Sequence, residues 1–295
     1  MQTARHLTAL LLALSVALAP TPVFARGKHI LWTVKGKQNT VYLLGSIHVL
    51  RAGDAALSGV AERAYDDAEQ LVMEIDPDDP GETDPMAMLE VMQRKALLPA
   101  GQSLRSVLGS DYESVNRRAQ QSGLDLALFD GFAPWMVATT LLQLELAKRG
   151  FAPEFGIEQV LARRAAGDEK PVQGLETTAQ QLELLAGMPM PMQKRFLVMT
   201  LDDSAQIDEE IGELVGAWQA GDTDALAALL SDEFDEFPDL YRRLTVDRNR
   251  AWVGRLADLL DDRDDYLVVV GALHLVGENS VVDLLQRRGY EVVQQ

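Results

Sequence analysis

The chain has 295 residues, of which 47% are hydrophobic and 24% are charged, a composition ordinary for a globular protein. Its formal net charge of −18 repels phosphate backbones and argues against nucleic acid as a partner. The absence of cysteine excludes a thiol nucleophile and a disulfide framework.

The first 25 residues have the organisation of a signal peptide. One basic residue, Arg5, precedes the apolar run Leu7–Ala19, and a cleavage signal follows at Val23–Ala25. The apolar run is shorter than the roughly 20 residues of a transmembrane helix. We therefore expect residues 1–25 to be removed. Residues 26–295 then form a single exported domain, periplasmic or secreted, with no stable membrane anchor.

The first structural unit of the expected mature chain is a strand, a helix and a further strand. Ile30–Val34 and Thr40–Leu44 are apolar or β-branched runs around a short polar turn, which predicts a hairpin. Leu57–Ala68 has helical spacing of apolar residues, and Gln70–Ile75 is a short apolar strand. The order and length are those of a βαβ unit.

Helices dominate the middle of the chain, from Asp84 to about Trp218. The helix predicted at Phe132–Lys148 is apolar on much of its surface and has Pro134 near its first turn, so we expect it to be buried. A short strand is predicted at Pro171–Gly174. The other predicted helices are Phe155–Ala166, Thr178–Leu185, Met192–Trp218, Thr223–Leu230 and Leu240–Leu260.

The last unit repeats the first. Tyr266–Val270 is a continuous apolar strand of the kind buried in parallel sheets. A helix is predicted at Glu278–Arg287 and a final strand at Tyr290–Val293. The pattern predicts one α/β domain with a mostly parallel sheet, two βαβ-type halves and a large helical insertion between them.

The two halves share a motif, Gly-x-x-His, directly after a predicted strand. It occurs at residues 45–48 and 271–274, so two of the three histidines beyond the leader, His48 and His274, have equivalent settings. Ligands bind at the carboxyl edge of open α/β sheets. If the two strands are neighbours, the two imidazoles lie within a few ångströms of each other.

Two imidazoles and a carboxylate are suitable ligands for a divalent transition metal with open positions for water and substrate. Glu74 is the leading carboxylate because it ends a strand at the same edge; the alternative is a solvent-facing acid. Glu158 and Glu176 are weaker candidates, since each also fits simple helix capping. Arg248 could stabilise an oxyanion or hold a carboxylate, or form a surface ion pair.

The motifs resemble those of the TraB/PrgY/GumN family, which includes the Tiki proteases, and the layout is closest to its bacterial GumN-like branch. The resemblance covers nearly the whole chain beyond the leader. Its motifs lie at Leu31–Val34, Val41–Val49, Leu71–Glu74, Gly156–Glu158, Leu175–Thr177, Arg248–Asn249 and Gly271–His274.

The resemblance implies a divided α/β sheet related to the erythromycin esterase and ChaN-like proteins. It implies a centre of His48, Glu74 and His274 with Arg248 nearby, and manganese or cobalt rather than zinc as the ion. We assign Glu74 and Arg248 as catalytic residues and His48, His274 and Glu74 as metal ligands. The residues predicted to bind substrate are Glu158, Glu176 and Asn249.

The first functional hypothesis is a metal-dependent hydrolase, metallopeptidase-like, that acts on a peptide or small-molecule substrate. Glu74 would ligate the ion or act as general base on its water. The alternative is a periplasmic protein that binds a metal, haem or a peptide without turnover.

Overall fold

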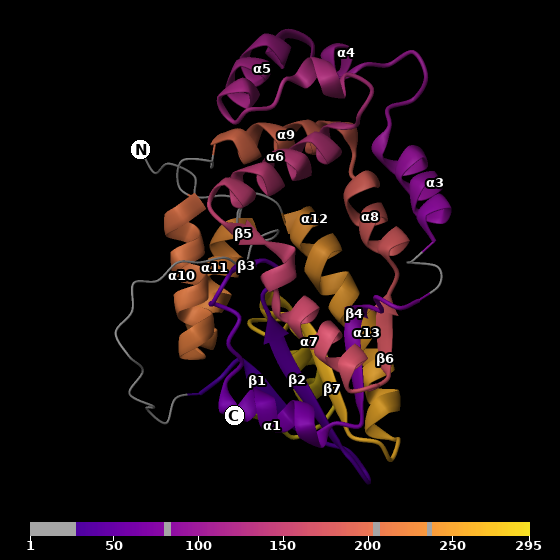
Figure 1. The fold of residues 1–295 in the computed structure, drawn as a ribbon, viewed down its shortest axis with the longest axis vertical. Coiled ribbons are helices and arrows are strands. Elements are labelled where there is room, and N and C mark those ends of the chain that lie inside the picture. The colour runs from indigo at the N-terminus through magenta and orange to yellow at the C-terminus, as the bar shows by residue number, and fades with distance from the viewer. Residues whose placement is uncertain (1–27, 80–83, 203–206, 235–237) are drawn as a thin grey trace.

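The computed structural model describes residues 28–79, 84–202, 207–234 and 238–295. The predicted signal peptide lies outside these residues. In the part that is described, none of the helices combines the length and the apolar character needed to cross a bilayer. The chain has the predicted α/β class, with a mixed, mostly parallel sheet below and a helical part above it (Figure 1).

Six strands form the main sheet, in the order β6-β4-β7-β2-β1-β8. Strands β6, β4, β7 and β2 are parallel, whereas β1 is antiparallel to both of its neighbours. The remaining two strands, β3 (Leu50–Arg51) and β5 (Phe151–Ala152), form a separate pair. The six strands span Leu31–Lys35 (β1), Thr40–Ser46 (β2), Gln70–Ile75 (β4), Val172–Glu176 (β6), Tyr266–Gly271 (β7) and Val292–Gln294 (β8).

The strands from the two ends of the chain interleave. The predicted β1–β2 hairpin forms, but β7 lies between β2 and β4 and separates the two strands of the first unit. All six residues of β7 are buried, which favours a central position with both edges paired. The sheet is therefore continuous, and the predicted arrangement of two βαβ-type halves with a divided sheet is not confirmed.

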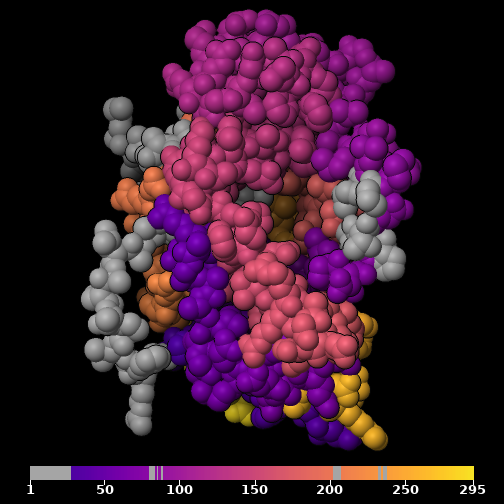
Figure 2. All heavy atoms as spheres, viewed as in Figure 1, coloured from indigo at the N-terminus to yellow at the C-terminus, as the bar shows by residue number. Residues whose placement is uncertain are grey.

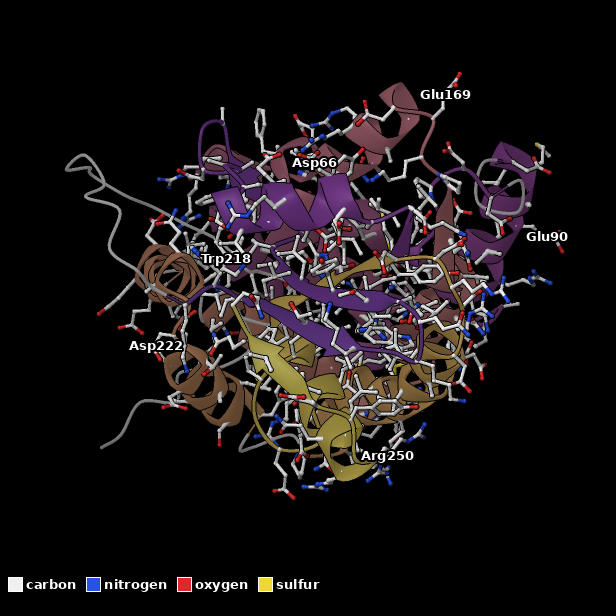
Figure 3. The ribbon with its side chains drawn as sticks, turned by 90° about the horizontal axis from the view of Figure 1, so that it is seen from below. Asp66, Glu90, Glu169, Trp218, Asp222 and Arg250 are labelled. Carbon is white, nitrogen blue, oxygen red and sulfur yellow. The ribbon has the colours of Figure 1, made fainter. Side chains whose placement is uncertain are left out.

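Helices cover both faces of the sheet (Figures 1 and 3). Helices α1 (Gly59–Asp67) and α7 (Ile157–Gly167) lie on one face, and α13 (Asp247–Leu260) and α14 (Val281–Arg287) lie on the other. Helix α1 begins at Ser58, whose side chain accepts a hydrogen bond from the Ala61 backbone N–H.

The helical part stands over the carboxyl ends of the parallel strands (Figure 1). Its central helix, α6, begins with Pro134 and buries most of its apolar side chains, as predicted. The predicted helix 192–218 is described as two helices, α9 and α10, with residues 203–206 between them outside the described residues. The helices span Pro85–Ala96 (α3), Leu104–Leu108 (α4), Tyr112–Gln121 (α5), Pro134–Lys148 (α6), Thr178–Ala186 (α8), Met190–Asp202 (α9), Ile207–Ala220 (α10) and Thr223–Phe234 (α11).

The long helix predicted at 240–260 contains a π-helical segment. Helix α12 (Pro238–Tyr241) leads into π-helix η5 (Arg242–Val246), which continues as α13. Single π turns inside helices are frequent at functional sites. This one ends two residues before Arg248.

Candidate active site

The ends of β2 and β7 bring the two Gly-x-x-His motifs together. The strands are parallel neighbours, with Ser46 paired to Gly271. His48 follows β2 by two residues, and His274 lies in the short 3-10 helix η6 (Ala272–His274) after β7. The predicted placement of the motifs on neighbouring strands is confirmed.

The two motif glycines allow close backbone approach. A Cβ atom at Gly271 would lie 3.1 Å from His48 Nε2 and 3.5 Å from Glu74 Oε1. A Cβ atom at Gly45 would collide with the side chain of Ile30 and lie 3.0 Å from the Ala272 Cα. Any side chain at these positions would push the site residues or the strands apart.

Glu74, near the end of β4, connects the two motifs. Its Oε1 accepts a hydrogen bond from the Gly271 backbone N–H at 2.9 Å. The same oxygen lies 3.9 Å from His48 Nε2 and 4.0 Å from His274 Nε2. Its other oxygen, Oε2, accepts from Arg248 at 2.5 Å and from Gln181 at 3.0 Å. The carboxylate is 8% exposed, so it is a buried charge with several partners.

Arg248, in the first turn of α13, lies between two carboxylates and an imidazole. Its Nη2 donates to Glu74, and its Nε donates to Glu176 Oε1 at 2.8 Å. Its Nη1 lies 2.9 Å from His274 Nε2 and donates to the Leu244 carbonyl, within the π-helix, at 3.1 Å. All three guanidinium nitrogens are therefore used inside the protein. Burial lowers the pKa of Arg248, but Glu74 and Glu176 outweigh it and raise that pKa.

His48 is held by Glu158, at the start of α7. His48 Nδ1 lies 2.6 Å from Glu158 Oε1, which also accepts a hydrogen bond from Ser46 Oγ. The contact requires Gly156, because a Cβ there would collide with the His48 carbonyl group. The His48 side chain is 44% exposed, and its Nε2 lies 3.9 Å from Glu74 Oε1.

His274 is held by Asn249, which is fully buried. Its Nδ1 lies 2.6 Å from Asn249 Oδ1, and the Asn249 amide donates to the Asn279 carbonyl at 2.9 Å. The imidazole packs on Trp252, with 4.5 Å between ring centroids. Asn249 therefore contacts His274, and its role in substrate binding stays a prediction.

The two imidazoles have opposite electrostatic environments. Burial lowers the pKa of His48, but the carboxylates of Glu158 and Glu74 outweigh it and raise the pKa to about 9. Burial and the Arg248 guanidinium together lower the pKa of His274 to about 3. Without a metal ion, His48 is therefore a cation and His274 is neutral at pH 7.

The two carboxylates on Arg248 also differ. Burial would raise the pKa of Glu74, but Arg248, both histidines and the Gly271 N–H hold it well below its usual range. Burial dominates at Glu176 and raises its pKa despite Arg248. Glu74 is thus firmly ionised, which suits a ligand better than a proton acceptor.

As arranged, these residues do not fit a metal ion bound by both histidines and Glu74. In the part of the chain that the structure describes, no group of three or more histidine, aspartate or glutamate side chains is placed to hold one. The donor types suit a divalent transition metal. However, His274 Nε2 is occupied by Arg248.

The structure thus brings together all seven residues selected from the sequence: His48, Glu74, Glu158, Glu176, Arg248, Asn249 and His274. It adds Gln181, Ser46 and Trp252, which sequence reasoning did not assign to the centre. Gln181 lies in α8, directly after β6. Its position at the beginning of a helix that follows a strand end was the signal that could have found it.

The molecular surface is hollowed between its lower and upper parts. Figure 2 shows this hollow between the lower sheet region and the upper helical part, on the side where α7 is seen. An open pocket lies among α3, α6, α8 and α9 and is lined by residues that include Lys95, Trp135 and Gln193. Helix α8 reaches both the candidate site and this pocket, with Gln181 on Glu74 and Ala186 at the pocket.

The fold and this centre define a class: an α/β protein with paired histidine and carboxylate groups at the carboxyl edge of its sheet. The chain belongs to the TraB/PrgY/gumN family, whose model matches residues 30–294. No solved structure matches it.

Bacterial and animal proteins are similar to the chain. It is 27% identical over 270 residues to YbaP of Escherichia coli (strain K12), covering 88% of this chain and 95% of YbaP. It is 24% identical to Metalloprotease TIKI2 of Xenopus tropicalis, covering 89% of this chain and 59% of that protein. The identity to Metalloprotease TIKI1 of Homo sapiens is also 24%, with 89% and 61% covered.

Proposed function

We propose that this chain is a metal-dependent hydrolase that acts on a peptide or ester bond. One observation carries the proposal. Two imidazoles, each held at Nδ1 by its own partner, have their Nε2 atoms 3.9 and 4.0 Å from the same oxygen of a buried carboxylate, Glu74 Oε1. Partners of this kind orient histidines in metal and hydrolytic centres. The names of the Tiki relatives support the metal and the peptide substrate.

The ion that we propose is a divalent transition metal, manganese or cobalt rather than zinc, with His48, Glu74 and His274 as ligands. Such an ion supplies Lewis acidity and an activated water. Binding through His274 requires Arg248 to leave Nε2, because the guanidinium occupies that nitrogen in the arrangement described.

The chain's own residues have distinct roles in this proposal. Glu158 and Asn249 are positioning residues, since each fixes one imidazole from the side away from Glu74. Arg248 and the Gly271 N–H keep Glu74 ionised. The low pKa of Glu74 makes it a ligand rather than the base. Glu176 acts through Arg248.

The hollow in Figure 2 is the proposed entry for substrate, and half-exposed His48 is the group that substrate would meet first. The helical part that borders it would provide the substrate-facing surface. We further propose export to the periplasm or the medium after removal of residues 1–25.

The test is hydrolysis of a fluorogenic peptide library and of nitrophenyl esters by chelator-treated protein supplied with Mn²⁺, Co²⁺ or Zn²⁺. We expect His48→Ala and His274→Ala each to lose about 100-fold or more in kcat/KM, as ligand removal does. His29→Ala is the matched control, because His29 lies outside both motifs and its backbone bonds to Gln294 and Gln295 at the far edge of the sheet; it should keep full activity. Wild-type rates in His48→Ala would overturn the proposal.

The alternative is a protein that binds a metal, haem or a peptide without turnover. Retention of a ligand through purification, together with no hydrolysis under any of the three ions, would support it over the hydrolase.

A further inference from the structure

Strand β6 forms one edge of the main sheet. Among the described strands it pairs with β4 alone, and Figure 1 shows it at the rim of the sheet, with no labelled helix or strand beyond it at that level. None of its five residues is buried, whereas all six residues of β7 are. The outer side of β6 therefore presents backbone groups to which a further strand can bind.

The register of the pairing with β4 decides which backbone groups face outward. Successive residues of a strand point their N–H and C=O groups to opposite sides. The Pro171 carbonyl accepts a hydrogen bond from the Leu71 N–H at 2.9 Å, so Pro171 and every second residue after it face β4. Val172, Gly174 and Glu176 therefore direct their backbone groups away from the sheet. In the part of the chain that the structure describes, none of these six groups takes part in a hydrogen bond.

The outer edge of β6 lacks the features that usually prevent strand pairing. Proteins protect exposed edges with charged side chains, proline within the strand, bulges or very short strands. Residues 172–175 are Val-Gln-Gly-Leu, without a charge or a proline, and the register with β4 is constant along the strand. The opposite edge strand, β8, has only three residues. Of the two edges, β6 is therefore the better site for an added strand.

Strand β6 also ends in the candidate active site. Its last residue, Glu176, accepts a hydrogen bond from Arg248 Nε at 2.8 Å, and the neighbouring strand β4 carries Glu74. Neighbouring strands lie about 4.8 Å apart, so a strand added outside β6 would run roughly 10 Å from β4. About three residues of extended chain, at roughly 3.3 Å each, cover that distance. A peptide paired with β6 thus reaches Glu74 by passing over Glu176.

We infer that the outer edge of β6 binds the peptide substrate as an added strand, through main-chain hydrogen bonds to Val172, Gly174 and Glu176. Main-chain pairing with an exposed sheet edge is a recurring mode of peptide recognition. The substrate class is then an extended, unfolded peptide that continues past the paired segment to the candidate site. The net charge of −18 favours basic peptides. The inference rests on the proposed hydrolase function for the fate of the peptide, but its test measures binding.

The probe is a fluorescein-labelled peptide with blocked ends, Lys-Val-Thr-Val-Thr-Val-Lys. Its β-branched residues favour a strand, and its lysines suit the negative charge of the protein. Fluorescence anisotropy measures its affinity for the metal-free protein. Val172→Pro removes one outward N–H and keeps the groups that pair with β4, so binding should weaken about fivefold, as for one lost hydrogen bond. Gly174 is unsuitable for substitution, because a Cβ there would lie 2.8 Å from the Asp76 nitrogen.

The matched control is Val292→Pro, the same exchange on the opposite edge strand. The Gln295 N–H donates to the Leu31 carbonyl, so the backbone groups of Val292 also face away from the sheet. This variant should bind the probe as wild type does.

Methylated peptides test the same pairing from the side of the probe. N-methylation of all seven residues removes every main-chain donor and should abolish binding to wild type. Methylation of the three valines alone leaves the donors on one edge of the peptide intact, so it should weaken binding less than about threefold. These two peptides decide the question if Val172→Pro does not fold.

Four results would overturn the inference. The first is no binding of the probe by wild type, and the second is equal weakening by Val172→Pro and Val292→Pro. The third is equal binding of the unmethylated and the fully methylated peptide. The fourth is a wild-type dimer in light scattering that Val172→Pro converts to a monomer, because a second copy of the chain would then occupy the edge.

The outcomes for the inference and for the proposed hydrolase are distinct. Strand-like binding of the probe with no hydrolysis of any substrate would support the inference and refute the hydrolase. Hydrolysis of peptides by a protein that fails the binding test would refute the inference alone.

Discussion

The two Gly-x-x-His motifs have the same residue pattern and both follow a strand, but their histidine side chains lie in different environments. His48 is 44% exposed and bonded to a carboxylate, whereas His274 is 9% exposed and bonded to an amide and a guanidinium. The pKa values move in opposite directions, to about 9 and about 3. The motif brings each ring close to Glu74, and a residue from a distant helix, Glu158 for His48 and Arg248 for His274, contributes to its charge state.

Removing Glu74 should have the largest effect, because both rings lose the carboxylate they share. In Glu74→Ala, Arg248 keeps a single carboxylate partner in a buried site, and breaking such a pair costs roughly 3–5 kcal/mol. Urea unfolding of the metal-free protein measures this. Glu183→Ala is the control: its pair with Lys95 is half-exposed and should be worth about 0–1 kcal/mol. Equal costs for the two variants would contradict the assignment.

Exchanging the residues that contact the Nδ1 atoms of His48 and His274 should bring the pKa values of the two imidazoles closer together. In Glu158→Gln the His48 ring loses the carboxylate that raises its pKa most, while Glu74 still raises it, so the pKa of His48 should fall from about 9. In Asn249→Asp, the pKa of His274 should rise from about 3. NMR titration of the ring protons in metal-free protein checks both, and unchanged values would refute the role given to these partners.

The same pair predicts a pH dependence of stability. The folded pKa of His48 lies above its unfolded value, so the charged ring stabilises the metal-free protein fully below pH 6.5, and this stabilisation is lost as pH rises through about 9. Unfolding free energy should therefore fall between these pH values in wild type. The Glu158→Gln variant should lack this decline in unfolding free energy. If its unfolding free energy fell with pH as steeply as that of wild type, the decline would come from other groups.

Alanine substitution of the two motif glycines should affect different properties of the protein. Alanine at 271 places a Cβ 3.1 Å from His48 Nε2, so activity should fall roughly 10- to 100-fold with little change in stability. Alanine at 45 meets Ile30 in the core, so unfolding free energy should fall by about 1–3 kcal/mol. Kinetics and thermal melts of both variants measure the two effects separately. If both variants lost the same property, the difference proposed between the two glycines would be wrong.

The smallest effect on stability is expected from a substitution at the second position of the motifs, where their residues differ. Ser46→Ala makes the first motif match Ala272 of the second and removes the hydrogen bond to Glu158. The loss should be about 1 kcal/mol, typical of one hydrogen bond. Thermal melts with Ala272→Ser as the reciprocal variant would check it. No change in Ser46→Ala would mean that this bond adds nothing to the hold on His48.

The parts of the fold that depend on local sequence could be predicted. The strand Gln70–Ile75 has the predicted bounds because its apolar run is bounded by polar residues and Pro77. The position of β7 between β2 and β4 could not be predicted. Parallel strands are connected through long segments, so the local sequence of a strand does not show which strand it pairs with. For the same reason the sequence indicated two separate halves.

The candidate site was predicted in membership but not in contacts. Strand ends indicated His48, Glu74 and His274, because side chains there meet at one edge. The bond between His48 and Glu158 joins residues 110 apart in sequence, and no spacing reveals it. Arg248 and Asn249 are adjacent, yet only the helix orientation decides that one meets carboxylates and the other His274.

The pairing of β2 with β7 also governs when the protein can fold. Ser46 meets Gly271 across 225 residues of chain, so the centre of the sheet closes only after almost the whole polypeptide has been made. Contacts this distant in sequence close late and slow folding. A chain shortened before β7 would also lack β8, and it would present unpaired edges on β2, β4 and β1, which invite aggregation. Residues 266–295 thus complete both the candidate active site and the centre of the sheet, which stay open until this segment has been synthesised.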